Sequence, residues 1–453
     1  MPLADRGVVR EPARRTPVVD AADVVVLGGG PAGMATATAA ARQGLDTLLV
    51  ERYGFLGGMG TAAMVTTFCG LYTSVAEGEQ PQRVVGGIVD EMLDRLRRLD
   101  GLAPPQDVFG RTFVQAYDTA AYKCAADDLL LSAGARLRLH SLAVGAVVEN
   151  ERITSLLVET KSGRQAIAGR AFVDCSGDAD LVAWSGAPWE KGDAQGWLQY
   201  PTMMFRLGGV DPERAEREGM PRLKELLRTA ARDGDLSPPR QAPVLRPQAH
   251  PTEWRANMTQ VSRSGGPIDG TSVDDLTFAE IEGRRQVMRY AQLVREHVPG
   301  FERSYIQELP AQIGIRETRR LVGRHVLQVE EVLGAARFPD VIGLNGWPVE
   351  RHVLNGIDWR WITPPGYQQL PYRVLVPRDG PHNLLVAGRC LSATPEAQAS
   401  ARVSGTCFAM GQAAGTAAAL ALRSGTSVAE VDVAALQGEL RRHGAKLDLA
   451  AVE

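Results

Sequence analysis

The sequence predicts a protein of the α/β class, in which one parallel-sheet domain is interrupted by an inserted α+β domain. Three observations lead to this prediction. Residues 23–51 follow the order strand, glycine-rich loop, helix and strand, which is the start of a βαβ unit. Residues 383–390, "NLLVAGRC", repeat the first half of such a unit without the glycines that should follow. The 453 residues exceed the usual ceiling for one compact core, so we expect a Rossmann-type domain that is discontinuous in sequence.

Composition limits the classes of function. An apolar share of 44%, a charged share of 23% and a net charge of −3 are typical of a soluble protein. There is no basic excess to neutralise a phosphate backbone, so we expect no nucleic-acid partner. The five cysteines form no C-x-x-C pair, which favours neither a disulfide framework nor a zinc site and fits a reduced cytoplasm.

Two segments resemble targeting or membrane signals and are interpreted otherwise. Residues 1–21 are expected to form a flexible tail, because Asp20 and Asp23 interrupt the apolar run that a leader would need. The longest uncharged run, residues 403–422, is near membrane-spanning length but is rich in glycine and alanine and poor in bulky residues. It predicts a buried, closely packed helix, and we expect no membrane contact.

The first element is the unit "DVVVLGGGPAGMATATAAARQGLDTLLVE" at residues 23–51. Residues 23–27 predict a buried strand, residues 32–43 an alanine-rich helix, and residues 47–50 a second strand. The glycine-rich loop therefore lies between the first strand and the positive N-terminus of the helix, where phosphate groups bind.

The glycines of this loop have separate expected roles. Gly28 allows the tight turn, Gly30 leaves room for a pyrophosphate, and Gly33 lets the helix pack closely. Glu51 stands where an acid is expected to bind ribose hydroxyls. A lone glycine triplet can be structural, but strand, helix, strand and acid in this order favour a dinucleotide site. The predicted cofactor contacts are Gly28, Gly30, Pro31, Ala32, Gly33, Glu51 and Arg52.

The segment after Glu51 distinguishes between cofactors. "RYGFLGGMGTAAMV" predicts a flexible glycine-rich loop rather than the crossover helix of a nicotinamide domain. Here the chain resembles the FAD-dependent oxidoreductases of the glutathione-reductase structural type, and most of all the broad bacterial FAD-dependent oxidoreductase family. The resemblance implies that Gly57, Gly58 and Met59 lie along the adenosine and ribityl parts of FAD.

The middle of the first FAD-binding part, residues 22–187, predicts further regular elements. These are helices at residues 86–99 and 119–133 and strands at 142–149, 153–160 and 171–174. The last strand runs into "SGDAD". The resemblance implies that this turn returns the chain to the flavin and that Gly177 and Asp178 contact it, although a plain strand-to-helix turn explains Asp178 equally well.

The two remaining segments are expected to be a substrate domain and the second FAD-binding part. Residues 188–370 hold most of the tryptophans, a proline-dense loop at 237–251 and a charged helix at 278–297. Residues 371–453 contain "AGR" and a glycine-rich helix, which in the resembled family complete the FAD domain. The resemblance implies flavin contacts by Gly388 and Arg389, and by free backbone N–H groups at the start of the helix near Gly405 and Thr406.

Three side chains are candidates for catalysis. Arg316 lies in an "R-E-T-R" stretch that resembles a recurrent substrate-side segment of the family, although a salt-bridged surface is equally consistent with it. Arg402 lies between the last strand and the last helix, where it can meet an anionic or carbonyl group. Tyr372 can bound the flavin or accept a proton, and a packed aromatic ring is its alternative role. The histidines nearest these segments, His325 and His352, are interpreted as structural, and we expect no metal.

These features predict an FAD-dependent dehydrogenase or oxidase that transfers hydride between flavin N5 and a small organic substrate, such as a specialised metabolite. The sequence has no second G-x-G-x-x-G motif, so we expect no NAD(P)H domain. It also has no paired cysteines, which disfavours a disulfide reductase. The alternatives are a monooxygenase, a fumarate-reductase-like enzyme, a flavin-binding protein without turnover, and a flavin halogenase. "DWRWITPP" resembles a halogenase motif, but the first lysine is Lys123, so the lysine expected after the nucleotide loop is missing. Nothing in the sequence predicts the oligomeric state.

Overall fold

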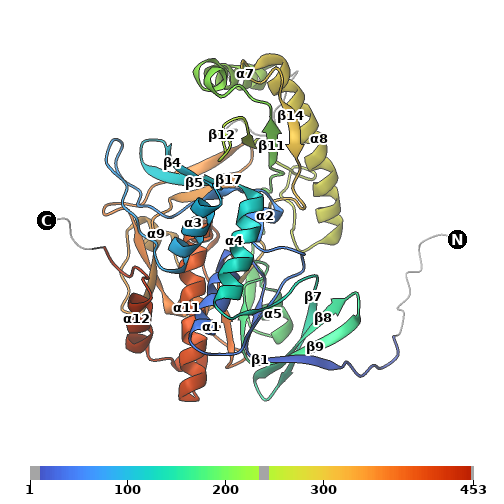
Figure 1. Cartoon of the computed structure of the whole chain (residues 1–453), viewed down its shortest axis with the longest axis vertical. Coiled ribbons are helices and arrows are strands. Elements are labelled where there is room, and N and C mark those ends of the chain that lie inside the picture. The colour runs from blue at the N-terminus through green and yellow to red at the C-terminus, as the bar shows by residue number, and fades with distance from the viewer. Residues whose placement is uncertain (1–10, 234–243, 450–453) are drawn as a thin grey trace.

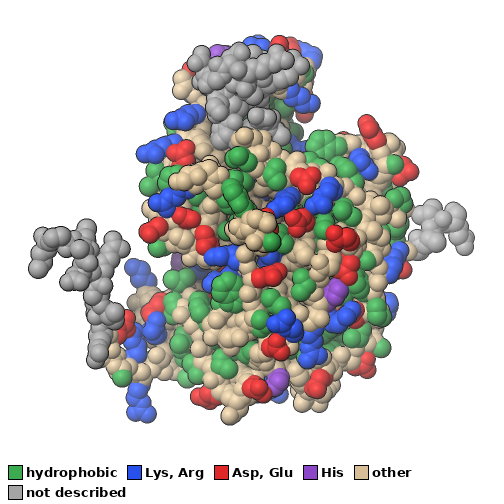
Figure 2. All heavy atoms as spheres, turned by 180° about the vertical axis from the view of Figure 1, so that it is seen from behind, with side chains coloured by type: hydrophobic (Ala, Val, Ile, Leu, Met, Phe, Trp, Pro, Cys, Tyr) green, Lys and Arg blue, Asp and Glu red, His purple; other side chains and the backbone are tan. Residues whose placement is uncertain are grey.

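The computed structural model describes residues 11–233 and 244–449 (Figure 1). Residues 1–10 of the predicted tail and residues 237–243 of the predicted proline-dense loop lie outside the described residues. The main parallel sheet and its helices form the lower part of the molecule in Figure 1, and a second group of strands and helices lies above them. On the opposite face, acidic and basic side chains are interspersed (Figure 2), in keeping with the small net charge.

The start of the first strand corrects one prediction. Strand β1 (Val18–Leu27) begins inside the segment that was expected to be a flexible tail. Val18 pairs with Ala166 of β9 (Gly163–Asp174), so the backbone of this extension is held by the sheet. The side chains of Val18 and Val19 are exposed, which is why no buried apolar pattern marked the extension in the sequence.

The main sheet has seven strands, in the order β6-β2-β1-β9-β8-β7, with β20 pairing with β9. Besides β1 and β9, its strands are β2 (Thr47–Val50), β6 (Arg136–Arg138), β7 (Leu142–Glu149), β8 (Arg152–Thr160) and β20 (Leu384–Val386). Leu27 pairs with both Val50 and Asp174, and Val386 pairs with Asp174, all in parallel strands. The carboxyl ends of β1, β2, β9 and β20 therefore meet at one edge. The strand from the end of the chain joins the sheet begun at residue 18, as the discontinuous fold predicted.

Two helices that pack on this sheet are in direct contact with each other. They are α1 (Pro31–Arg42) and α11 (Ser404–Ser424), which run side by side in Figure 1. A Cβ atom at Gly411 would lie 2.1 Å from the carbonyl oxygen of Ala32, and one at Gly415 would lie 2.2 Å from that of Thr36. The helices thus touch backbone to backbone, as the glycine- and alanine-rich run predicted. In the described part of the chain, no helix is both long and apolar enough to cross a membrane.

The further helices fall into two groups, those whose predicted ends agree with the structure to within two residues and those that were not predicted. They are α3 (Ile88–Arg98) and α4 (Thr119–Ser132), which were predicted, and α5 (Asp180–Ser185), α9 (Val329–Leu333), α10 (Pro395–Ala401) and α12 (Val433–Arg442), which were not. Small sheets cover the carboxyl edge of the main sheet. One of them has three strands, β3 (Thr67–Phe68), β4 (Leu102–Val108) and β5 (Thr112–Tyr117). The others are strand pairs, namely β10 (Trp189–Lys191) with β15 (Arg319–Leu321), β16 (Val341–Asn345) with β19 (Gln368–Pro371), and β17 (Val349–Val353) with β18 (Gly356–Arg360).

A second hydrophobic core lies above the first and extends from Met203 to Ile315. Its elements are β11 (Phe205–Gly208), β12 (Val244–Pro247), β13 (Trp254–Asn257), β14 (Tyr305–Glu308), α7 (Met220–Asp233) and α8 (Val273–His297). Helix α8 begins five residues before its predicted start, where Ser272 accepts a hydrogen bond from the N–H of Asp275. The division of the chain at residues 188 and 370 stays a prediction. Residues between 327 and 376 pack into the main core, which favours a shorter insert.

Candidate active site

The loop after β1 is shaped by its glycines. Gly28 has a φ of 100°, its N–H donates to the carbonyl of Val50 at 2.8 Å, and a Cβ there would lie 2.5 Å from the carbonyl oxygen of Cys175. A Cβ at Gly33 would lie 1.8 Å from the carbonyl oxygen of Gly28. Neither position accepts a side chain. A Cβ at Gly30 would meet only the Cα of Gly58, at 3.7 Å, so open space lies in front of this glycine and the helix N-terminus.

Glu51 joins the loops at the carboxyl end of β2. Its Oε2 atom accepts from the N–H of Gly29 at 2.6 Å, and its Oε1 atom accepts from the N–H of Tyr53 at 2.9 Å. The N–H of Gly57 donates to the carbonyl of Gly29 at 2.8 Å. The carboxylate therefore holds the glycine loop and the following segment in one arrangement, and it also lines the pocket.

The turns after β9 and β20 are held together by an ion pair. Nη2 of Arg389 donates to Oδ1 of Asp178 at 2.7 Å, and the hydroxyl of Thr318 donates to the same oxygen at 2.9 Å. Burial alone would raise the pKa of Asp178, but Arg389 and Arg52 lower it overall. This ion pair joins the turn after β20 to the "SGDAD" turn after β9. Arg389 lines the pocket, and Asp178 lies behind its wall.

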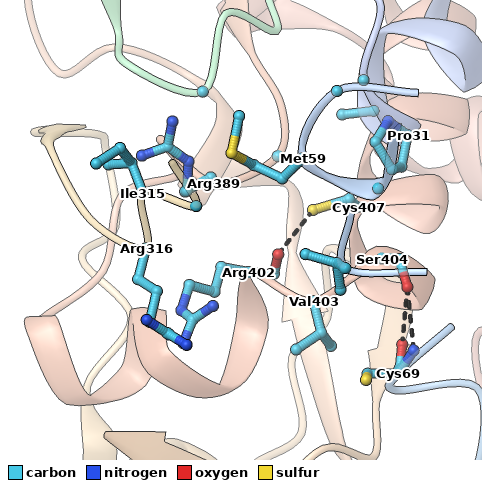
Figure 3. A pocket seen from close by; sticks show the side chains of 18 of the residues that line it. Pro31, Met59, Cys69, Ile315, Arg316, Arg389, Arg402, Val403, Ser404 and Cys407 are labelled. Carbon is cyan, nitrogen blue, oxygen red and sulfur yellow. Dashed lines mark hydrogen bonds between the residues drawn. The ribbon is translucent and has the colours of Figure 1, made fainter. Parts of the chain in front are cut away.

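These loops open into one pocket with a cavity volume of about 300 Å³, a size typical of small-molecule sites. It runs from the glycine loops along Met59 and Cys407 to Arg316 and Arg402 (Figure 3). Most residues predicted as site residues line it, namely Gly28, Gly30, Pro31, Ala32, Glu51, Arg52, Gly58, Met59, Gly177, Arg316, Gly388, Arg389 and Arg402. Gly33, Gly57, Asp178, Tyr372, Gly405 and Thr406 lie behind the wall.

Tyr372 is packed in the core and not at the pocket. It is buried, and its hydroxyl donates to the carbonyl of Val428 at 2.7 Å. Burial raises the pKa of this phenol. The structure therefore corrects its assignment as a catalytic candidate and favours its alternative role as a packed aromatic ring.

The start of α11 also differs from the expectation of free N–H groups. The N–H of Gly405 donates to the carbonyl of Cys69 at 2.9 Å, and a Cβ there would lie 2.7 Å from the carbonyl oxygen of Gly70. The hydroxyl of Thr406 donates to Asn345 at 3.3 Å. Gly405 thus holds the segment at Cys69 and Gly70 against the helix, Thr406 holds Asn345, and Val403 and Ser404 line the pocket.

The far end of the pocket is strongly charged. Arg402 follows α10, donates from Nη2 to the side chain of Gln199 at 3.2 Å, and has no hydrogen-bond partner for Nε among the described residues. Arg316 donates to the carbonyl of Tyr200 at 2.6 Å. The two guanidinium groups lie close together in Figure 3. Burial lowers the pKa of Arg402, partly offset by Glu350 and Glu317.

Glu350 and His352 also line this end of the pocket. Glu350 was not predicted from the sequence, and His352 was interpreted as structural. Oε2 of Glu350 accepts from the indole N–H of Trp347 at 3.0 Å, and Oε1 lies 3.3 Å from Nε2 of His352. Burial would raise the pKa of Glu350, but His352, Arg402 and Arg316 lower it to about 2. The available signal was the alternation in "VERHV", which places residues 350 and 352 on one face of a strand.

The cysteines at the pocket do not suggest thiolate chemistry. Cys69, Cys175 and Cys407 line the pocket, and all five cysteines are free. Burial raises the pKa of Cys69 and of Cys407 to about 12, so both thiols stay protonated at neutral pH. Among the described residues, no cluster of histidine, cysteine and carboxylate side chains could hold a metal ion.

Residues 23–440 match the family model described as FAD dependent oxidoreductase. The chain belongs to this family. FAD is accordingly its cofactor, and the glycine loops fit it, because Gly28, Gly30, Gly58 and Gly388 leave the wall of the pocket free of side chains where a pyrophosphate would lie. The narrower assignment to a bacterial, glutathione-reductase-type group stays a prediction.

Curated relatives match only part of this chain. Thiamine thiazole synthase from Sulfolobus acidocaldarius is 31% identical over 175 residues, and the enzyme of the same name from Metallosphaera sedula is 28% identical over 174 residues. Each match covers 36% of this chain, and it covers 57% and 56% of the two relatives. The chain therefore spans little more than half the length of these relatives.

Solved structures match over most of the chain at low similarity. A geranylgeranyl bacteriochlorophyll reductase-like protein from Thermoplasma acidophilum is 14% identical, with 94% of this chain and 84% of that chain covered and a TM-score of 0.46. The p-nitrophenol 4-monooxygenase of Pseudomonas putida is 11% identical, with 93% and 84% covered and a TM-score of 0.47. At this level the similarities identify no activity.

Proposed function

We propose that the protein oxidises or reduces a small organic substrate by hydride transfer to or from N5 of FAD. The observation that carries this proposal is the single pocket, which joins the glycine loops at one end to Arg316, Glu350 and Arg402 at the other. A cofactor bound along the loops would place its reactive ring next to these charged side chains. The protein would then have to bind and orient a substrate there.

The cofactor is proposed to lie along the predicted contacts. Gly30 and Gly58 lie against each other and both line the pocket at the start of α1, which suits the pyrophosphate. Glu51 lies at the end of β2, where its carboxylate suits the ribose of the adenosine half. Gly388 and Arg389 follow β20 and suit the ribityl phosphate region, and Val403 with Ser404 borders the ring end.

The chemistry of the far end follows from its charges. When bound, FAD supplies a reversible acceptor of two electrons. Arg402 lines the pocket with a buried positive charge, so it can bind and polarise an oxygen atom of the substrate. Glu350 stays ionised at neutral pH because of its low pKa; it pairs with His352, and its negative charge favours the charged state of Arg402. His352 lines the pocket beside this carboxylate and is the group proposed to carry a proton.

The halogenase alternative receives no support from the pocket. Of the tryptophans of "DWRWITPP", Trp359 lines the pocket, but it is held in a cluster of rings, since it stacks on Trp361 with ring centres 6.1 Å apart and contacts Trp347 at the same distance. In the described part of the chain, no lysine lines the pocket. A monooxygenase and a flavin-binding protein without turnover remain the alternatives that an experiment must separate.

Anaerobic reduction of the flavin tests the proposal. The FAD-loaded protein is mixed with a panel of small organic compounds without oxygen or nicotinamide, and the visible flavin band is recorded. Bleaching by one of these compounds alone supports a dehydrogenase or oxidase. Reduction only by NAD(P)H, with oxygen uptake coupled to substrate hydroxylation, would identify a monooxygenase, and a flavin that no compound reduces would identify a binding protein.

A further inference from the structure

Three arginines form a row across the sheet of the second core, where strands β12, β13 and β11 lie side by side. Arg255 of β13 pairs in register with Arg246 of β12 on one side and with Arg206 of β11 on the other. Residues directly opposite in antiparallel strands share a face, so three like charges are brought together. Such an arrangement is unfavourable unless negative charge compensates it.

Among the described residues, only one of the three arginines forms ion pairs with carboxylates. Arg206 forms ion pairs with Asp118, Glu253 and Glu308. Arg246 and Arg255 donate to main-chain carbonyls instead, Arg246 to Asp107 at 3.0 Å and Arg255 to Val65 at 2.6 Å. Within the described ranges, neither forms an ion pair with a carboxylate, and Nε of Arg255 has no hydrogen-bond partner.

Both uncompensated arginines line the pocket of the candidate active site. Arg255 is only 6% exposed, and burial lowers the pKa of its guanidinium to about 10, so it still carries its charge at neutral pH. Burial also lowers the pKa of Arg246. A buried charge with unfilled hydrogen-bonding capacity is costly unless a counter-ion binds to it.

The pocket wall beside these arginines is apolar. Val108, Val114, Trp347 and Val403 form a small hydrophobic cluster there, with Trp359 packed against it. Phe109, at the turn between β4 and β5, lies edge-on to Trp359 with ring centres 5.5 Å apart. A ligand that fits both features combines an anionic group with an apolar or aromatic body.

We propose that Arg246 and Arg255 form the carboxylate subsite of the substrate pocket, and that the substrate is a small apolar or aromatic carboxylic acid. A planar guanidinium fork matches the two oxygens of a carboxylate, and both arginines line the pocket. The identity of the bound acid as a substrate rests on the proposed hydride transfer. Arg316 and Arg402 line the same pocket from other elements of the chain.

Calorimetric titration of the FAD-loaded full chain tests the subsite. The probes are benzoate, benzamide as its uncharged isostere, and phenyl phosphate. Benzoate should bind roughly tenfold or more tightly than benzamide, since charge-assisted hydrogen bonds are the stronger ones. Arg246→Met and Arg255→Met should each weaken benzoate about tenfold and leave benzamide binding and FAD content unchanged. Arg246→Lys should retain part of the benzoate affinity, because lysine keeps the positive charge but lacks the planar guanidinium group.

A nearby arginine provides the matched control. Arg111 lies over the ring of Trp361 at 4.3 Å but does not line the pocket, so Arg111→Met should bind benzoate like the parent. Arg246 is less buried than Arg255, so Arg246→Met decides the matter if Arg255→Met does not fold. The proposal would be overturned if benzoate and benzamide bind equally, or if phenyl phosphate binds more tightly than benzoate. It would also be overturned if Arg246→Met keeps the benzoate affinity of the parent or loses FAD. Benzoate binding through Arg246 with a flavin that no compound reduces would reject only the proposed hydride transfer.

Discussion

Arg402 shows what a single residue contributes to the pocket. Its Nη2 atom is fixed by Gln199, and its Nε atom is left without a partner among the described residues. The sequence placed Arg402 correctly because it lies between two recognisable elements. Glu350 could not be found in this way, since its role depends on His352 and Arg316, which the fold brings together from distant segments.

We predict that Arg402→Met lowers kcat about 100-fold, the usual effect of removing one electrostatic donor from an active site. FAD content should stay unchanged, because Arg402 lies at the substrate end. Steady-state kinetics with a substrate found by anaerobic bleaching, together with flavin absorbance per chain, measures both quantities. Arg402→Lys is the matched variant and should retain intermediate activity. If flavin is lost in proportion to activity, Arg402 belongs to the cofactor site.

Gly30→Leu is predicted to fold and to lose FAD. The protein leaves open space beside Gly30, so a side chain there displaces the pyrophosphate and little else. Gly33→Leu should instead fail to fold, because its Cβ would meet the carbonyl of Gly28. Thermal unfolding and flavin content distinguish the two effects. Gly438→Leu, at a position with nothing within 4 Å, is the control and should resemble the parent. A Gly30→Leu protein with full FAD occupancy would refute the assignment.

Asp180 gives a prediction about pH. Burial, followed by Asp178 and Asp174, raises the pKa of Asp180 from its ordinary value of 3.8 to about 7. Between these two values the native state keeps a proton that the unfolded state releases, so stability falls as the pH rises through the range. We expect Asp180→Asn to lose less stability than the parent over this range in thermal unfolding. The exposed control Asp379→Asn should follow the parent, and parallel curves for parent and Asp180→Asn would contradict the prediction.

At the scale of elements, local patterns in the sequence were sufficient where burial and periodicity coincide. The ranges expected for α3, α4, β2 and β7 agree with the structure; α3 buries one apolar face, and β2 is buried at all four positions. The start of β1 was missed because its first residues pair with β9 while their side chains face solvent. The start of α11 was misread because the carbonyl of Cys69, distant in sequence, accepts the N–H of Gly405.

The turn after β20 can be tested at Gly388. This residue has a φ of 97°, and a Cβ there would lie 3.0 Å from Cβ of Ala32 at the start of α1. Gly388→Leu should therefore disturb the glycine loop and lower FAD occupancy severalfold. Gly425→Leu is a close control, since Gly425 has a φ of 67° but nothing within 4 Å. The Gly425→Leu variant has the strain of a positive φ but no steric clash, so it should keep its FAD. Full occupancy in Gly388→Leu would exclude the C-terminal turn from the cofactor site.

At the scale of the whole molecule, the pocket lies where two hydrophobic cores meet. The main core supplies the glycine loops and Arg402, and the sheet of the second core supplies Arg246 and Arg255. The sequence predicted the α/β class, the discontinuous fold and FAD as the cofactor, because their signals are motifs of contiguous residues. It did not predict the arginine row, because that row depends on the register between strands that no local pattern specifies.

The crystal structure of the FAD-loaded chain tests the central claim most directly. The account predicts density for the pyrophosphate alongside Gly30 and Gly58, the adenosine ribose at Glu51, and the flavin ring beside Val403 with a face open toward Arg402. Density for FAD elsewhere in the chain, or a flavin ring separated from Arg402 and Arg316 by the pocket wall, would contradict the account of one pocket that joins cofactor and substrate.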